Sequence, residues 1–284
     1  MENLTNISVI KGILEKYNFT FSKALGQNFL VNPSVCPRMA ELGGAKENVG
    51  VIEIGPGIGV LSHQLAIRAK KIVCIEIDDR LIPILEETLA EHDNIKVLHS
   101  DVLKVDLHQL IKDEFAGMKV VICANLPYYI TSPIIMALLE QRLPVASITV
   151  MVQKEAAQRL CAQPGSRECG AISAAIWYYS EAYELFDVSR GSFMPAPDVD
   201  STVIRFDVRS EPTVAVSNER LFFNVIKGAF SQRRKTASNA VSAHLGRPKA
   251  QIIAAFEQAG VDPSIRAEKM TLQNFADVTY QLSI

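Results

Sequence analysis

The sequence predicts an α/β protein with a seven-stranded, mostly parallel sheet and a small all-helical C-terminal domain. Between residues 49 and 152, apolar runs of strand length alternate with helical patterns, as in sheets whose parallel strands are joined by helices. The runs are rich in Val and Ile, which is typical of strands buried on both faces. After Arg209-Ser210-Glu211-Pro212 the strand-like runs stop and only helical periodicity continues.

Each expected element is a stretch with the period or composition of its type. Strands are expected at Val49–Ile54, Lys71–Glu76, Ile95–His99, Lys119–Ala124, Ala146–Val152, Ala182–Val188 and Thr202–Val208. Helices are expected at residues 33–44, Leu61–Ala69, Arg80–Glu91, Leu107–Phe115, Ser132–Glu140, Glu219–Ala229, Lys235–His244, Lys249–Ala259 and Leu272–Leu282. The break near residue 210 predicts two domains, residues 1–209 and 210–284.

Composition excludes several classes of protein. The chain has 284 residues and is 48% hydrophobic, which supports a real core and argues against disorder. No apolar run is long enough to span a membrane, and Met1–Asn6 show no basic segment followed by an apolar one, so a cytoplasmic protein is expected. The five cysteines lack C-x-x-C spacing and the five histidines lack metal-ligand spacing, so reduced thiols and no metal are expected.

Charge is distributed unevenly along the chain. The net charge is only −2, but residues 220–256 contain seven Lys or Arg and no Asp or Glu, which leaves 22 basic and 31 acidic residues elsewhere, a balance of −9. Arg233, Arg234 and Lys235 form the one tight cluster, which suits contacts to nucleic-acid phosphates. The alternative is that these charges are spread over solvated helix faces.

A glycine loop and two acids follow the first three strands. Glu53-Ile54-Gly55-Pro56-Gly57-Ile58-Gly59 has the spacing G-x-G-x-G, which differs from the dinucleotide pattern, and no Lys follows as in a triphosphate loop. Glu76 ends the second strand, where a carboxylate can accept ribose hydroxyls, and Asp101 follows the third, where it can accept from an adenine amine. Together these residues predict a nucleoside pocket. Taken singly, the loop is an ordinary strand-to-helix turn and Asp101 a helix cap.

Asn125-Leu126-Pro127-Tyr128 directly follows the fourth strand and suits attack by an exocyclic base amine on an electrophile. The Asn125 side-chain carbonyl and a backbone carbonyl such as that of Leu126 can accept both N–H groups and expose the nitrogen lone pair. Pro127 is rigid and has no competing N–H donor, and Tyr128 offers a face for a flipped base. The alternative is a plain strand-ending turn.

These residues resemble the class I S-adenosylmethionine-dependent methyltransferases, and more closely the ribosomal RNA adenine N6,N6-dimethyltransferase family. The similarity covers nearly the whole chain. It is carried by Gly26-Gln27-Asn28-Phe29-Leu30, Glu53 through Gly59, Asp101, Asn125 through Tyr129, Phe193-Met194-Pro195-Ala196-Pro197, Val199-Asp200-Ser201, Ala229 through Thr236 and Arg266-Ala267-Glu268. The Gln-Asn-Phe-Leu and Phe-Ser-Gln-Arg-Arg-Lys stretches are the specific ones, whereas the glycine loop is shared across the superfamily. Asp198 departs from the pattern, since a basic residue is expected there.

The resemblance implies a role for each matching residue. Asn28 and Leu30 would close over the methionine end of S-adenosylmethionine, and Gly55 and Gly57 would let the backbone approach it. Glu76 would hold the ribose, Asp101 the adenine amine, and Asn125 would lie between cofactor and target. Leu126, Pro127 and Tyr128 would complete the catalytic tetrapeptide, with Phe193 as a second stacking wall opposite Tyr128. The alternative for Phe193 is an ordinary core residue, since large aromatic side chains are usually buried.

The function that the resemblance implies is dimethylation of two adjacent adenines near the 3′ end of small-subunit (16S) rRNA. Residues 1–209 would form the catalytic domain and 210–284 an RNA-binding domain. The partner would be small-subunit rRNA or a pre-assembled small subunit, and the protein a monomer. Three alternatives stay open: a large-subunit rRNA methyltransferase of the antibiotic-resistance type, a non-catalytic ribosome assembly factor, and a DNA adenine methyltransferase.

Overall fold

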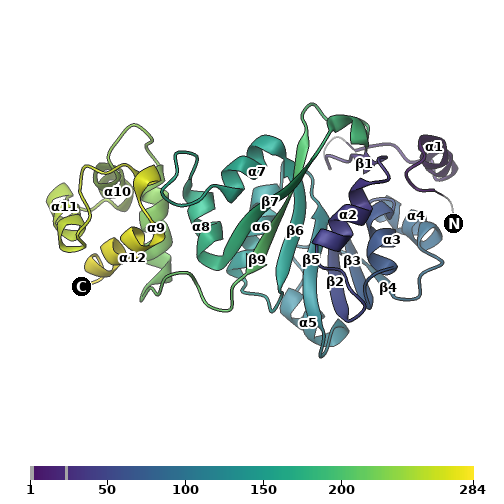
Figure 1. The fold of residues 1–284 in the computed structure, drawn as a ribbon, viewed down its shortest axis with the longest axis horizontal. Coiled ribbons are helices and arrows are strands. Elements are labelled where there is room, and N and C mark those ends of the chain that lie inside the picture. The colour runs from purple at the N-terminus through teal and green to yellow at the C-terminus, as the bar shows by residue number, and fades with distance from the viewer. Residues whose placement is uncertain (1–2, 23–24) are drawn as a thin grey trace. The chain divides into compact units, whose positions relative to one another are not determined.

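The computed structural model of the chain describes residues 3–22 and 25–284 (Figure 1). Met1 and Glu2, which begin the segment predicted to lack a secretion signal, lie outside the described residues. The chain forms two compact units. The first consists of Met1–Ala157 and Tyr183–Val208, and the second of Gln158–Ala182 and Arg209–Ile284. The second unit therefore includes residues 158–182, which the sequence analysis assigned to the first domain.

A seven-stranded sheet forms the centre of the first unit, as the sequence predicts. Its strand order is β4-β3-β2-β5-β6-β9-β7. The strands are β2 (Val49–Ile54), β3 (Lys71–Glu76), β4 (Ile95–His99), β5 (Lys119–Asn125), β6 (Ser147–Gln153), β7 (Ser180–Val188) and β9 (Ser201–Val208). Strands β2 to β6 pair in parallel, and β9 pairs with β6 in antiparallel orientation.

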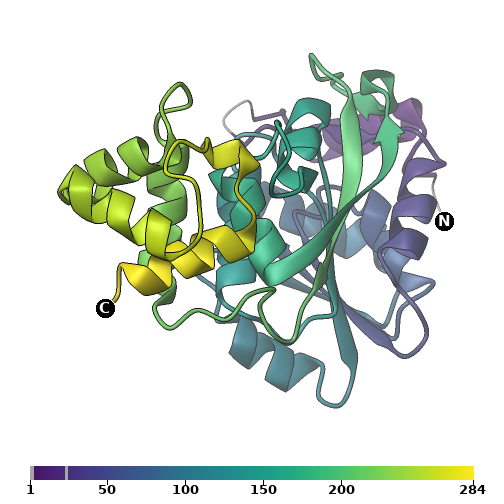
Figure 2. The same ribbon diagram turned by 60° about the vertical axis from the view of Figure 1, so that its left-hand side comes forward.

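Helices cover both faces of this sheet (Figures 1 and 2). Right-handed crossovers place α3 and α4, which connect β2, β3 and β4, on one face and α5 and α6, which connect β4, β5 and β6, on the other. From the N-terminus onward, the first seven α-helices in the described residues are α1 (Ile7–Lys16), α2 (Val35–Leu42), α3 (Val60–Ala66), α4 (Ile82–Thr88), α5 (Leu107–Glu114), α6 (Thr131–Glu140) and α7 (Lys154–Cys161). Because both faces are covered, every residue of β2 is buried, and Gly50 within it admits the Phe115 ring, which would lie 2.2 Å from a Cβ.

One expected helix is divided in the structure. The pattern from Arg80 to Glu91 predicts a single helix, but a 3-10 turn η1 (Asp79–Leu81) comes first and α4 ends at Thr88. The Asp78 carboxylate caps η1 by accepting a hydrogen bond from the Arg80 backbone N–H at 3.1 Å. Pro83 lies in the first turn of α4, where a backbone N–H has no partner within the helix, so the proline is tolerated.

Two short strands without a sequence signal join segments that are far apart in the chain. β1 (Phe29–Leu30) pairs in antiparallel orientation with β8 (Phe193–Met194), which follows the 3-10 turn η2 (Arg190–Ser192). In this register Leu30 lies opposite Phe193. The small sheet therefore places the N-terminal Gln-Asn-Phe-Leu stretch beside the loop that contains Phe193.

The second unit is helical apart from the first residues of β7, which it includes. Residues 210–284, all of which the structure describes, contain no strand, and their four expected helices are present. The unit contains α8 (Ala171–Tyr179), α9 (Glu219–Phe230), α10 (Ala237–Leu245), α11 (Lys249–Gln258), the 3-10 turn η3 (Ala267–Lys269) and α12 (Leu272–Gln281). Phe222, Phe256 and Phe275 are fully buried in this unit. Among the described residues of both units, no helix has the length and apolar character needed to cross a membrane.

Candidate active site

The carboxyl ends of four parallel strands meet at one pocket in the first unit. β2 ends before Gly55, β3 ends at Glu76, β4 leads to Asp101 and β5 ends at Asn125, and these four residues line the pocket. The strand order reverses between β2 and β5, and open α/β sheets bind ligands at such a point. The pocket is lined by all the catalytic and cofactor candidates from the sequence: Asn28, Leu30, Gly55, Gly57, Glu76, Asp101, Asn125, Leu126, Pro127, Tyr128 and Phe193.

The glycine loop turns sharply and leaves open space on the pocket side. The φ angle is +70° at Gly55, +63° at Gly57 and +91° at Gly59, in the left-handed region that favours glycine. A Cβ at Gly55 would meet only the backbone oxygen of Asn125, at 4.0 Å. A ligand can therefore come close to the backbone at Gly55.

Glu76 is a buried carboxylate with spare hydrogen-bonding capacity. Its side chain accepts hydrogen bonds from the Gly57 N–H at 3.3 Å and from the Asp78 N–H at 2.9 Å. Burial raises the pKa of Glu76, and these backbone donors partly oppose the rise. A carboxylate has about four lone-pair positions, so capacity is left for two hydroxyl donors.

Asp101 lies at the next strand end and is partly exposed. Its Oδ1 accepts a hydrogen bond from the Leu103 N–H at 3.0 Å, and its Oδ2 lies 3.7 Å from Lys104 Nζ. Two apolar residues also line the pocket: Ile77, which directly follows Glu76, and Val102, which directly precedes Leu103. Neither apolar residue was predicted from the sequence, although its position next to a strand-end acid was a usable signal. Apolar side chains beside two carboxylates suit a flat heterocycle that carries hydroxyl and amino groups.

The N-terminal segment forms another wall of the pocket. Leu30 is buried through its pairing with Phe193, and the Asn28 side-chain amide donates to the Gly26 carbonyl at 3.1 Å. The Phe29 ring lies 3.3 Å from the place a Cβ would take on Gly57, so this wall contacts the glycine loop. Gln27 also lines the pocket.

Asn125 and Leu126 present unpaired acceptors at the pocket. Within the described ranges, 3–22 and 25–284, neither the Asn125 side-chain amide nor the Leu126 backbone carbonyl has a hydrogen-bond partner. The Pro127 carbonyl, in contrast, accepts from the Ile130 N–H at 3.2 Å and from Thr131 Oγ1 at 3.1 Å. Two acceptors are therefore available at the end of β5.

Two aromatic side chains line the same pocket. The Tyr128 hydroxyl is 2.7 Å from Ser201 Oγ on β9, a contact that fixes the ring, and burial raises the pKa of Tyr128. Phe193 is only 4% exposed, so most of its surface is already packed against protein. Beside them Tyr129 is 59% exposed at the rim.

Glu53 is a pocket residue to which the sequence analysis gave no separate role. It is 1% exposed in β2, and Cys74 Sγ donates a hydrogen bond to its Oε2 at 3.3 Å. Burial raises the pKa of Glu53 to about 7. An acid inside an otherwise apolar strand was the signal that could have identified it.

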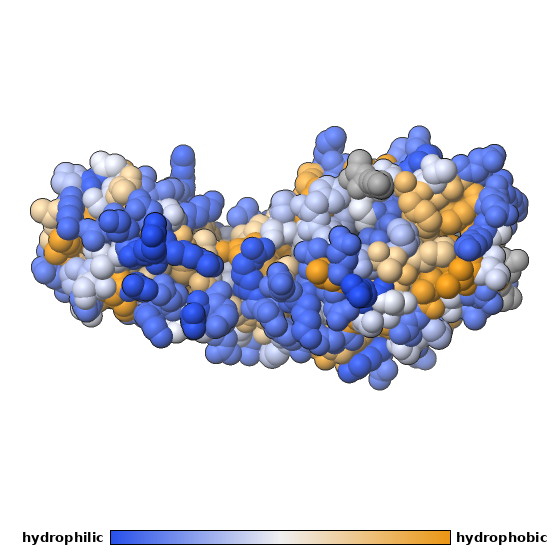
Figure 3. All heavy atoms as spheres, turned by 90° about the horizontal axis from the view of Figure 1, so that it is seen from above, coloured by the Kyte–Doolittle hydropathy of each residue, from blue (hydrophilic) through white to orange (hydrophobic). Residues whose placement is uncertain are grey.

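The basic cluster lies in the second unit, in the turn between α9 and α10. Arg233, Arg234 and Lys235 are exposed and have no acidic partner in the described part of the chain. Arg247 differs, because its guanidinium donates to the Leu282 carbonyl at 2.8 Å. Figure 3 shows strongly hydrophilic side chains gathered on the face of the second unit that is in view. Among the residues that the structure describes, no group of three or more His, Cys, Asp or Glu side chains is placed to hold a metal.

The fold and this strand-end pocket define a class I S-adenosylmethionine-dependent methyltransferase fold. Two solved structures share it. One is the 23S rRNA methyltransferase ErmE, with a TM-score of 0.69 and 25% identity, covering 90% of this chain and 100% of that one. The other is a dimethyladenosine transferase from Plasmodium falciparum, with a TM-score of 0.75 and 23% identity, covering 90% and 97% of the two chains.

A narrower relationship comes from the sequence comparisons. The family model of ribosomal RNA adenine dimethylase matches residues 18–283, and the chain belongs to this family. The chain is 48% identical to the ribosomal RNA small subunit methyltransferase A of Geobacillus sp. (strain WCH70), over 95% of this chain and 94% of that protein. It is likewise 48% identical to the protein of the same name from Geobacillus thermodenitrificans (strain NG80-2), over 96% and 94%.

Proposed function

We propose that this protein transfers methyl groups from S-adenosylmethionine to the 6-amino group of two adjacent adenines near the 3′ end of small-subunit rRNA, giving N6,N6-dimethyladenosine. The observation that carries the proposal is the 48% identity, over 95% of the chain, to a relative named as a small-subunit rRNA methyltransferase. The two unpaired acceptors at Asn125 and Leu126 support it, because they match the two N–H groups of an adenine amine.

The pocket fits the methyl donor at several points. The open space at Gly55 admits a ligand next to the backbone, Glu76 has acceptor capacity for ribose hydroxyls, and Asp101 can accept from an adenine amine. Asn28 and Leu30 would enclose the methionine end from the N-terminal wall. When bound, the donor supplies an electrophilic methyl group on a sulfonium that is a good leaving group.

The chain's own residues then have to expose the lone pair of the amine and hold it in place. In our proposal the Asn125 amide oxygen and the Leu126 carbonyl accept its two N–H groups and draw the nitrogen toward tetrahedral geometry. Tyr128 would stack on the target base, which has left its helical stack at a cost of a few kcal/mol. Phe193 lines the same pocket, but because it is 4% exposed it would have to give up packing contacts to stack on the base. Positioning of this kind can supply a large part of a rate enhancement. The proton leaves to water, so no strong base is needed.

The helical part from residue 210 to 284 is proposed to bind RNA. Arg233, Arg234 and Lys235 are exposed and unpaired in the described structure, so they can contact phosphates without first breaking an ion pair. Such contacts contribute affinity and do not read the sequence. We place the boundary between the catalytic and RNA-binding parts near residue 210.

Large-subunit rRNA is the second candidate target, because the 23S rRNA methyltransferase ErmE shares the fold at 25% identity. The test is transfer of a radiolabelled methyl group to unmethylated small subunits, naked rRNA and large subunits in parallel. We expect label on the small-subunit adenines, four methyl groups for two bases. Label confined to large subunits would replace the proposed target with the second candidate.

A further inference from the structure

A group of three polar side chains fastens the N-terminal wall of the pocket to the end of β3. We propose that Gln27 and Asp78, together with Arg80, form a clasp that positions residues 26–30 against the methyl donor. This inference rests on the proposed function, since it concerns how the same pocket holds its donor. Gln27 and Asp78 are positioning residues in this account, because they would act through Asn28 and Leu30.

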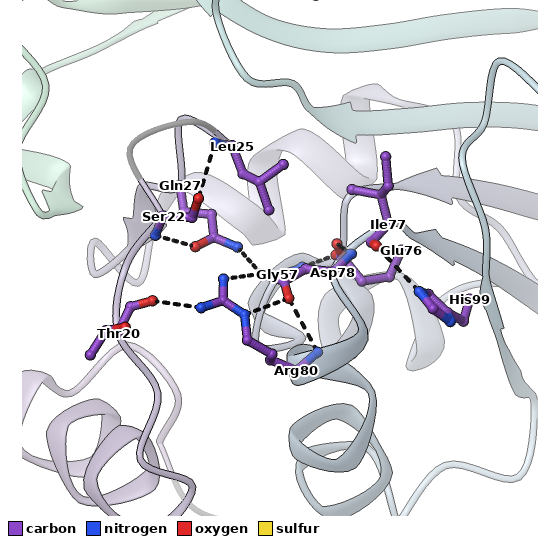
Figure 4. A network of polar contacts seen from close by, with 10 residues as sticks. All are labelled: Thr20, Ser22, Leu25, Gln27, Gly57, Glu76, Ile77, Asp78, Arg80 and His99. Carbon is purple, nitrogen blue, oxygen red and sulfur yellow. Dashed lines mark hydrogen bonds and ion pairs between the residues drawn. The ribbon is translucent and has the colours of Figure 1, made fainter.

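The clasp is centred on the Asp78 carboxylate, which is 4% exposed (Figure 4). The Gln27 side-chain amide donates to Asp78 Oδ2 at 2.7 Å. Arg80 donates from Nε to Oδ1 at 2.8 Å and from Nη2 to Oδ2 at 2.6 Å, a two-pronged pairing. Both carboxylate oxygens thus accept hydrogen bonds from side chains.

The same group also holds the chain that leads to the wall. The Gln27 side-chain oxygen accepts a hydrogen bond from the Ser22 N–H at 2.9 Å. Arg80 donates to the Thr20 carbonyl at 3.3 Å, and its guanidinium lies 4.9 Å from the centre of the Phe19 ring. The clasp therefore contacts the N-terminal segment both near Phe19 and at Gln27.

On its other side the clasp is joined to the ribose carboxylate. The Asp78 N–H donates to Glu76 Oε1, while Glu76 Oε2 accepts from Gly57 in the glycine loop. A single line of hydrogen bonds thus connects Gln27, Asp78, Glu76 and Gly57 (Figure 4). Movement of the N-terminal wall would therefore displace Glu76 and Gly57, two of the positions that we propose hold the donor.

The charge of Asp78 is needed for this arrangement. Each of its oxygens faces N–H donors, so an Asn would turn an amide NH2 toward a donor and lose at least one contact. The hydrogen bonds from Arg80 hold the pKa of Asp78 below its ordinary value, and that from Gln27 acts in the same direction. The clasp is therefore fully formed at neutral pH.

The variants Asp78→Asn and Gln27→Leu test the proposal, with Asp79→Asn as the matched control. Asp79 is the neighbouring residue and is exposed, and no hydrogen bond or ion pair involves its side chain in the described structure. Gln27→Leu removes the hydrogen bond to Asp78 and the one from the Ser22 N–H, and it leaves both the Asp78–Arg80 pair and the cap of η1 intact. This variant therefore decides the matter if Asp78→Asn does not fold.

Calorimetric binding of S-adenosylhomocysteine is the first measurement. We expect about tenfold weaker binding in both clasp variants, as for loss of one hydrogen bond to a charged group, and wild-type binding in Asp79→Asn. The second is steady-state kinetics, where KM for S-adenosylmethionine should rise by a similar factor while kcat changes little. Hydrogen exchange of peptides covering residues 25–30 should become faster.

Wild-type affinity in folded Asp78→Asn and Gln27→Leu would overturn the clasp, and so would a loss of thermal stability without a change in affinity. Those results would leave the proposed function intact. If the wild-type protein bound no S-adenosylhomocysteine, the proposed function itself would fail.

Discussion

Carboxyl groups around the pocket differ according to what surrounds each residue. Glu53 is enclosed in β2, and burial raises its pKa to about 7. Burial also raises the pKa of Glu76, although two backbone N–H groups donate to it. Asp78 shows the opposite change, because Arg80 stabilises its charged form. Buried acids without a cation are therefore harder to ionise here than the paired one.

Glu53 predicts a pH dependence of stability. The pKa of Glu53 is higher in the folded state than in the unfolded state. Its contribution to the free energy of unfolding is therefore fully present below about pH 4.5 and is lost as the pH rises to about 7. Over this window the free energy of unfolding of the wild-type protein should fall by about 1.4 kcal/mol per pH unit, and in Glu53→Gln this fall should be absent. Chemical denaturation at a series of pH values measures the slope. Parallel slopes for the two proteins would show that Glu53 is already ionised.

Single residues with a distinctive strand-end position could be predicted from the sequence. Glu76, Asp101 and Asn125 each follow an apolar run, and all three line the pocket. Gln27 and Asp78 could not be predicted in this way, because their hydrogen bond joins residues 51 positions apart and neither belongs to a periodic pattern.

The glycine loop between β2 and α3 shows what a connecting element contributes to the site. Its backbone takes positive φ angles, and Gly55 leaves the space open in which we propose that the donor binds. The small β1–β8 sheet contributes another wall by pairing Leu30 with Phe193. The glycine loop and the small sheet supply backbone and apolar surface around the pocket. Charged side chains alone could not enclose a ligand.

Gly55→Ala should weaken S-adenosylhomocysteine binding by about tenfold or more, since the added methyl group occupies the donor's space. Gly117→Ala is the matched control: its φ is +73°, against +70° at Gly55, and nothing lies within 4 Å of the position of its Cβ. Both variants should lose similar stability from backbone strain, about 1 kcal/mol. Equal affinities in the two variants would contradict a donor at Gly55.

The strands of the main sheet were predictable, whereas three helices, α1, α7 and α8, and the two short strands were not predicted from the sequence. All seven main strands begin and end within two residues of the predicted positions. β1 and β8 contain two residues each, too few for a period, and their pairing depends on the tertiary fold. The expected helix from Arg80 to Glu91 was wrong in its bounds because the Asp78 cap starts a 3-10 turn first.

At the scale of the molecule, the candidate active site and the basic cluster lie in different units. The pocket and its acids lie in the first unit, whereas the cluster Arg233, Arg234 and Lys235 lies in the second. A net charge of −2 conceals this division. We interpret the second unit as an RNA-binding part that adds affinity to a catalytic part whose net charge is negative, with 17 Lys or Arg against 23 Asp or Glu.

Replacement of Arg233, Arg234 and Lys235 with Ala should weaken RNA binding and reduce the slope of log affinity against log salt by about 2 to 3. The control replaces Lys11, Lys46 and Lys112, three exposed lysines of the first unit, and changes the net charge equally. Filter binding at several salt concentrations measures both slopes. If the two triple variants have the same slope, the cluster has no special role in RNA binding.

The central claim is that Asn125 directs an adenine amine at a methyl donor, and Asn125→Ala tests it most directly. The measurement is the single-turnover rate of methyl transfer to unmethylated small subunits at saturating donor, for wild type and variant. We expect the rate to fall by about 100-fold or more, comparable to the loss of a polar group that stabilises a transition state, while S-adenosylhomocysteine affinity and thermal unfolding change little. A rate close to that of the wild-type protein would contradict the account.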